Sequence, residues 1–138
     1  MAAFIEALKG HKAEGGVAGR GGRYHRNRDT MVSGMRALGF ETLLDDRWQS
    51  PIIVTFFCPA DPKFSFKGFY EAMKEMGFII YPGKLTVVDT FRVGCIGQMD
   101  DHVMHKVVKA AGDALTHMGV LSAVPPAAAL EERKILTA

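Results

Sequence analysis

The sequence has few cysteines and little net charge. Its 138 residues include two cysteines, Cys58 and Cys95, which lie far apart in apolar runs and form no CxxC pair. A free thiol in such a run behaves as a small buried hydrophobe, which predicts a reducing, cytoplasmic location. The formal charge is only +2, and charged residues make up 23% of the sequence. Composition therefore indicates neither a nucleic-acid partner nor a membrane partner.

The sequence also lacks the motifs that bind phosphate or activate a nucleophile. Five glycines fall within residues 15–22, but Gly22 stands where a P-loop needs lysine, and the GxGxxG pattern fails at Tyr24. We expect this run to form a flexible bend between two helices. No GxSxG motif occurs, and no window approaches the roughly 20 apolar residues that a membrane span needs.

The sequence does contain enough apolar residues for one core, at 48% of the chain. Their periodicity predicts helices at 4–8, 19–38, 66–76 and 101–118, strands at 52–57, 78–81 and 91–96, a type II turn at 81–84 and a short extended segment at 85–88. This order predicts an α/β, two-layer fold with helices on one face of a small sheet. We expect one domain over residues 1–120 and a weakly ordered tail over residues 121–138 that adds little to the core.

Two clusters of ionisable residues raise the question of a function. Four arginines between residues 20 and 28 are compatible with a nucleic-acid groove, but no aromatic platform alternates with them, so a solvated helix face is favoured. His102 and His105 are close enough to share a metal ion, yet they fall on a polar helix face with no clear further ligand beyond Asp101. We therefore predict no metal site.

Arg92 is the best candidate for a binding residue. It lies in the apolar strand 91–96, where alternation places Arg92 and Gly94 on the same face. An arginine in an apolar strand is costly unless its guanidinium meets a carboxylate or a phosphate, and Gly94 leaves open space beside it. An internal salt bridge to Asp or Glu, or an edge-strand position, is the alternative.

Four segments carry a family resemblance, namely residues 13–24, 49–56, 78–86 and 89–97. They resemble the C-terminal part of 2-aminoethylphosphonate–pyruvate aminotransferases, which are class V enzymes of the aspartate-aminotransferase fold type. The most specific stretch is 78–97, which ends in AspThrPheArgValGlyCysIleGly. The resemblance covers nearly all of the chain, roughly residues 4–119.

The resemblance implies that residues 1–120 form the small domain of this fold type, with a mostly antiparallel or mixed sheet. It implies that Arg92 binds the substrate carboxylate while an amino group moves from 2-aminoethylphosphonate to pyruvate. It also implies a pyridoxal 5′-phosphate cofactor, which acts as an electron sink, and a homodimer when the enzyme is complete. The family's cofactor-binding lysine lies upstream of the matched region. No catalytic or cofactor-binding residue is therefore expected in this chain.

Other functions stay open beside this one. The chain is also compatible with another class V transaminase, such as an alanine–glyoxylate type, or with a non-catalytic module that binds a carboxylate or a protein through Arg92. A non-functional remnant is a further alternative. Helical spacing begins directly after Met1, so we expect a fragment that is inactive alone and needs a large domain or a partner chain.

Overall fold

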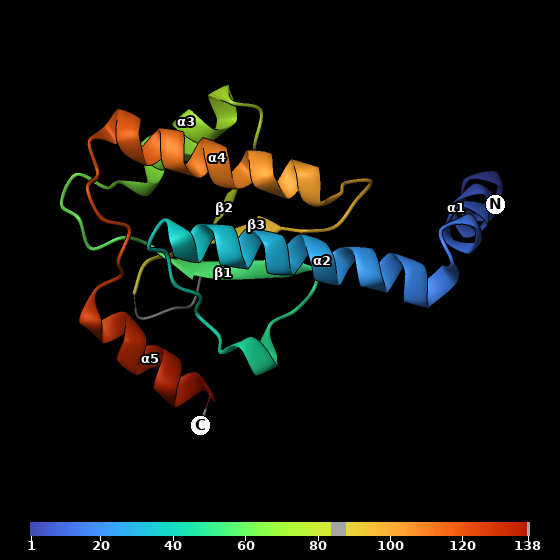
Figure 1. Cartoon of the computed structure of the whole chain (residues 1–138), viewed down its shortest axis with the longest axis horizontal. Coiled ribbons are helices and arrows are strands. Elements are labelled where there is room, and N and C mark those ends of the chain that lie inside the picture. Colours follow the sequence, from blue (N-terminus) through green and yellow to red (C-terminus); the bar gives the residue numbers. More distant parts are fainter. Residues whose placement is uncertain (84–87, 138) are drawn as a thin grey trace.

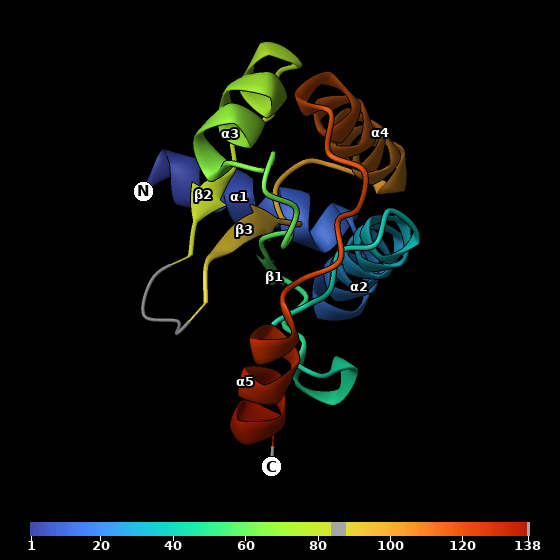
Figure 2. The same cartoon turned by 90° about the vertical axis from the view of Figure 1, so that its left-hand side faces the viewer.

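The computed structural model describes residues 1–83 and 88–137. Its elements are α1 (Ala2–Ala13), α2 (Gly16–Ala37), the 3-10 helix η1 (Asp46–Trp48), β1 (Ile53–Phe57), α3 (Phe66–Glu75), β2 (Tyr81–Pro82), β3 (Thr90–Gly94), α4 (Asp101–Met118) and α5 (Ala127–Thr137) (Figure 1). The strands form one antiparallel sheet in the order β1-β3-β2. The predicted α/β class is confirmed, with α2, α3 and α4 gathered on one side of the strands (Figure 2).

An aromatic cluster fills the space between the sheet and the helices. The rings of Phe56 in β1 and Phe91 in β3 stack at a centroid distance of 5.6 Å, and Phe69 of α3 meets Phe91 edge-on at 5.3 Å. Phe40, which follows α2, packs edge-on against both strand residues. All four side chains are fully buried, so the core is built on one face of the sheet.

The starts of α3 and α4 and the end of α2 fall where the sequence signals place them. Ser65 Oγ accepts a hydrogen bond from the Gly68 amide at 3.1 Å, and Asp100 Oδ1 accepts one from the Val103 amide at 3.2 Å. Each side chain satisfies an amide that the first helical turn leaves unpaired. Gly39 has a φ of +100° and ends α2 in the left-handed conformation. These boundaries are confirmed.

The predicted strand at 78–81 is mostly wrong. Only Tyr81 of that range lies in a strand, because the Phe78 amide donates to the carbonyl oxygen of Met73 and closes the end of α3. Gly77, with a φ of +89°, allows this helix-ending turn. The predicted turn at 81–84 and the extended segment at 85–88 extend into residues outside the described ranges, and both stay predictions.

The bend between the first two helices is narrower than expected. It is confined to Glu14 and Gly15, and α2 begins at Gly16, three residues before the predicted start. Gly15 has a φ of +92°, which a residue with a side chain rarely adopts. Helix α1 therefore leaves the body at an angle (Figure 1) and buries none of its own residues.

The tail contributes more than expected. Ala123 and Ala129 are buried, and Arg133 Nη1 in α5 lies 3.0 Å from Glu41 Oε2. The expectation that residues 121–138 add little to the core is therefore wrong. The buried residues Ala123 and Ala129 are small and give only a weak hydrophobic pattern, so periodicity did not reveal that the tail is packed. The division into a domain at 1–120 and a tail stays a prediction. Within the described ranges, no helix is both long enough and apolar enough to cross a membrane.

Candidate functional site

Arg92 lies on the central strand β3, on the face of the sheet opposite the aromatic cluster. Alternation buries Phe91 and leaves Arg92 half-buried on the other face, as predicted. In the strand register, Arg92 is paired with Thr55 of β1 and with Tyr81 of β2. Directly opposed residues share a face of the sheet, so these three side chains form a row across it, which we call the Arg92 row.

The space beside the Arg92 row is open. A Cβ atom built on Gly94 would meet no heavy atom of the described residues within 4 Å. Gly94 lies two residues along β3 from Arg92 and on the same face. The predicted room next to the guanidinium is therefore present.

The guanidinium of Arg92 is only partly hydrogen-bonded. Its Nη2 atom donates to the carbonyl oxygen of Pro82 at 3.2 Å, while its buried Nε atom has no hydrogen-bond partner among the described residues. Within residues 1–83 and 88–137, no Asp or Glu forms an ion pair with it. The internal salt bridge is therefore not found in those ranges, and the edge position is wrong because β3 is central. A buried N–H without an acceptor is costly, so this arrangement favours an incoming anion.

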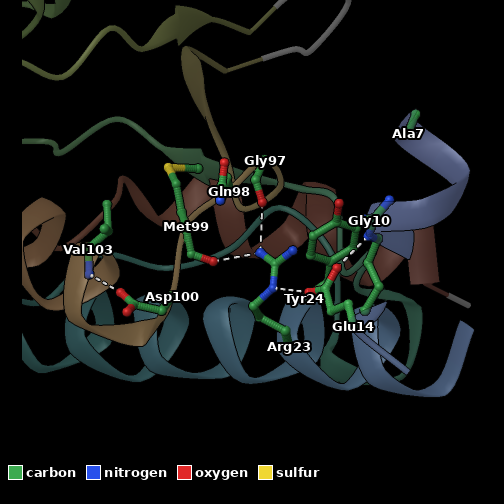
Figure 3. A pocket seen from close by; sticks show the side chains of 11 residues that line it. Ala7, Gly10, Glu14, Arg23, Tyr24, Gly97, Gln98, Met99, Asp100 and Val103 are labelled. Atoms are coloured by element: carbon green, nitrogen blue, oxygen red, sulfur yellow. Dashed lines mark hydrogen bonds and ion pairs between the residues drawn. The ribbon is translucent and has the colours of Figure 1, made fainter. Parts of the chain in front are cut away.

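The arginines at the start of α2 form a structural network, and the predicted solvated face is wrong for Arg20 and Arg23. Arg20 Nε donates to Glu14 Oε2 at 2.7 Å, and Arg23 Nε donates to Glu14 Oε1. Arg23 Nη1 also donates to the carbonyl oxygens of Gly97 at 2.7 Å and Met99 at 2.6 Å (Figure 3). These acceptors come 74 and 76 residues later in the chain, where spacing along α2 cannot reveal them.

This network lines a pocket of about 720 Å³ among α1, α2 and the loop that follows β3 (Figure 3). Hydrogen bonds from Arg23 and Arg20 lower the pKa of the Glu14 carboxyl from 4.5 to about 2. The two guanidinium groups are thus matched by a carboxylate and by backbone carbonyls. The Arg23 guanidinium holds the loop after β3 in place through its hydrogen bonds to that loop. Because the arginines of this network already have acceptors among the described residues, the pocket offers a ligand no strong charge to pair with.

Asn27 is the residue of this region that sequence analysis missed. It is fully buried in α2, and its Nδ2 atom donates to the carbonyl oxygens of Cys95 at 3.1 Å and Met99 at 3.0 Å. Asparagine is unfavourable in a helix interior, so its presence within the predicted helix was the one sequence signal that could have pointed to a special role. Its contacts connect α2 to both ends of the loop that follows β3, the strand that carries Arg92.

Neither the cysteines nor the histidines form a reactive site. Burial raises the pKa of the Cys58 and Cys95 thiols to about 12, so neither is a thiolate near neutral pH. His102 and His105 are exposed on the polar side of α4, as predicted. In the part of the chain that the structure describes, no three His, Cys, Asp or Glu residues are grouped to hold a metal ion.

Comparison with known proteins finds relatives that match the whole chain. No protein-family model matches the chain. A 2-aminoethylphosphonate–pyruvate transaminase from Rhizobium meliloti is 69% identical over 138 residues, which is all of this chain and 36% of that protein. The corresponding protein from Paraburkholderia xenovorans is 65% identical over 136 residues, 99% of this chain and 35% of that protein. By sequence, the chain is similar over its whole length to the C-terminal part of 2-aminoethylphosphonate–pyruvate transaminases. It spans about a third of the length of these relatives, in their C-terminal part.

A solved structure supports the fold. The crystal structure of ureidoglycine–glyoxylate aminotransferase from Bacillus subtilis matches with a TM-score of 0.69 at 16% identity, over 90% of this chain and 32% of that one. At this identity the match is evidence for the fold alone. The predicted small-domain fold of an aminotransferase is confirmed.

The lysines of the chain do not fit the role of a cofactor-binding lysine. A lysine that binds pyridoxal phosphate covalently has its ammonium pKa lowered by desolvation or by a neighbouring cation. Every lysine in the described ranges is exposed. We therefore derive no chemical step through the cofactor from this chain.

Proposed function

We propose that the chain is the C-terminal small domain of a pyridoxal-phosphate-dependent transaminase that moves an amino group from 2-aminoethylphosphonate to pyruvate. The observation that carries the proposal is the 69% identity, over the whole chain, to a protein of that name. Other class V transaminases are less well supported, because a solved aminotransferase structure that matches the fold is only 16% identical. The proposal concerns the complete protein, of which this chain supplies one part.

Within this function, Arg92 binds the acidic group of the substrate. Both substrates carry one: a carboxylate in pyruvate and a phosphonate in 2-aminoethylphosphonate. The planar guanidinium pairs with two oxygens of such a group, which a lysine cannot do. In support, among the described residues Arg92 has no acidic partner and its buried Nε atom has no acceptor. A bound anion would replace the single 3.2 Å bond to the Pro82 carbonyl with two charge-assisted hydrogen bonds.

The cofactor is held outside this chain. When bound, pyridoxal phosphate supplies an electron sink for the transfer of the amino group. The exposed lysines support the view that the covalent link forms elsewhere in the complete protein. We also propose that the complete enzyme is a cytoplasmic homodimer. Two free, buried thiols are compatible with a reducing compartment.

The test is a chimeric protein that joins this chain to the part of the Rhizobium meliloti relative outside the matched 36%. With pyridoxal phosphate, 2-aminoethylphosphonate and pyruvate, the chimera is expected to form alanine, and the chain alone is expected to form none. Borohydride reduction should attach the cofactor to the chimera but not to the chain alone. An active chimera that turns over alanine and glyoxylate but not 2-aminoethylphosphonate would contradict the substrate assignment.

The role of Arg92 is tested in the same chimera. Arg92→Lys keeps the charge but loses the planar fork, and we expect kcat/KM to fall about 30-fold or more, equivalent to about 2 kcal/mol. Kinetics unchanged by Arg92→Lys would remove Arg92 from the site.

A further inference from the structure

The two proposed substrates present anions of different shape. A carboxylate has two oxygens in one plane, which the flat fork of a single arginine can bind completely. A phosphonate is tetrahedral and has three oxygens, so one of them lies outside the plane of the guanidinium. A site that accepts the phosphonate therefore needs a further donor placed beside Arg92.

Thr55 is placed to be that donor. The carbonyl oxygen of Thr55 accepts a hydrogen bond from the Leu43 amide at 2.9 Å, so its backbone polar groups point away from β3. Thr55 and Arg92 are therefore a non-hydrogen-bonded antiparallel pair, the type in which opposed side chains lie closest. Thr55 is half-buried, and among the described residues its hydroxyl has no hydrogen-bond partner.

Tyr81, at the other end of the Arg92 row, is less well placed. The carbonyl oxygen of Thr90, two residues before Arg92, accepts from the Gly83 amide at 2.7 Å, so alternate residues of β3 turn their polar groups toward β2. Arg92 and Tyr81 are therefore a hydrogen-bonded pair, in which the side chains are further apart. The Tyr81 side chain is also 58% exposed.

We propose that Thr55 determines specificity for the phosphonate substrate. Its hydroxyl donates a hydrogen bond to the phosphonate oxygen that Arg92 leaves unbound. Pyruvate needs no such donor, because Arg92 binds both of its carboxylate oxygens. This inference rests on the proposed function, since it takes Arg92 as the anion-binding residue. Thr55 takes no part in the transfer of the amino group.

The experiment compares the two substrates in the chimera. Thr55→Val removes the hydroxyl at nearly constant shape, and we expect it to raise KM for 2-aminoethylphosphonate about tenfold or more while KM for pyruvate changes less than about twofold. Thr55→Ser keeps the donor and should keep the parental ratio of the two KM values. Phosphorus NMR titration of 2-aminoethylphosphonate without added pyruvate should show the same loss of binding in Thr55→Val.

Controls separate the possible outcomes. Thr116→Val removes a hydroxyl from the exposed side of α4 and should leave both KM values unchanged. Equal changes in the two KM values for Thr55→Val, no change in either, or a selective loss in Tyr81→Phe instead, would overturn the proposal. If the chimera forms no alanine from 2-aminoethylphosphonate and pyruvate, the proposed function fails. If the chimera is active but Arg92→Lys has no effect, Arg92 is removed from the site and the role of Thr55 fails with it. If Arg92→Lys weakens both substrates while Thr55→Val is not selective, only the role of Thr55 fails. Unfolding midpoints of all variants identify any variant that does not fold.

Discussion

Asn27 and Cys95, 68 residues apart in sequence, are joined by a 3.1 Å hydrogen bond from the Asn27 Nδ2 atom to the Cys95 carbonyl oxygen. The same amide group donates to the Met99 carbonyl at 3.0 Å. This buried side chain therefore binds α2 to both ends of the loop that follows β3. Because Arg92 lies three residues before Cys95, the contact supports the strand on which the proposed anion site depends.

Replacing Asn27 is expected to destabilise the chain. Asn27→Ala leaves two backbone carbonyls without their donor, so the free energy of unfolding should fall by about 2 kcal/mol. Asn27→Asp should be worse, because it turns a carboxylate toward those carbonyls. Urea unfolding followed by circular dichroism measures both. Gln98→Ala, at an exposed position in the same loop, is the control. A loss for Asn27→Ala no larger than that of the control would contradict this role.

The Glu14 network predicts a pH dependence. The pKa of the Glu14 carboxyl in the folded chain, about 2, lies below its ordinary value of 4.5. Ionised Glu14 therefore stabilises the folded state above pH 4.5, and this contribution is lost as the pH falls from 4.5 to 2. The difference in urea midpoint between the parent chain and Glu14→Gln should be present near neutral pH and should vanish toward pH 2. A difference that persists at low pH would mean that the Glu14 charge is not responsible.

Two glycines of α2 should respond in opposite directions to alanine. A Cβ atom at Gly19 would lie 1.8 Å from the Glu14 carbonyl oxygen, so Gly19→Ala must open the junction of α1 and α2 and destabilise it. A Cβ atom at Gly21 meets nothing within 4 Å. Gly21→Ala should therefore stabilise the helix by about 0.5–1 kcal/mol through helix propensity alone. Melting temperatures of the two variants check this, and a shift of the same sign in both would refute the close approach at Gly19.

Adjacent alanines test whether α5 packs on the body. Ala129 is fully buried and Ala128 is exposed, and both lie in the first turn of α5, where a carboxylate favours the helix dipole. Ala129→Asp should lower the free energy of unfolding by about 2 kcal/mol or more, because it buries an unpaired charge, whereas Ala128→Asp should change it little. Equal stability of the two variants in urea would show that α5 is not docked as described.

Local features were predictable from the sequence, and distant partners were not. The caps at Ser65 and Asp100 depend on residues three positions away, and the faces of β3 follow from simple alternation. The acceptors of Arg23 depend on a loop far along the chain, so a solvated face was the natural expectation. For α5, burial through small alanines left no periodic signal. The missing strand at 78–80 reflects a local competition, in which the Phe78 amide closes α3 instead of pairing in the sheet.

The strand order has a consequence for synthesis on the ribosome. β3 is the central strand of the sheet, yet it is the last of the three to be made, and β1 and β2 pair with it and not with each other. The apolar segment Ile53–Phe57 must therefore wait until residues 90–94 have emerged before its main partner exists. Over that interval it presents an open hydrogen-bonding edge to any other nascent chain. A chaperone that covers such an edge until β3 arrives would protect the half-made chain from aggregation.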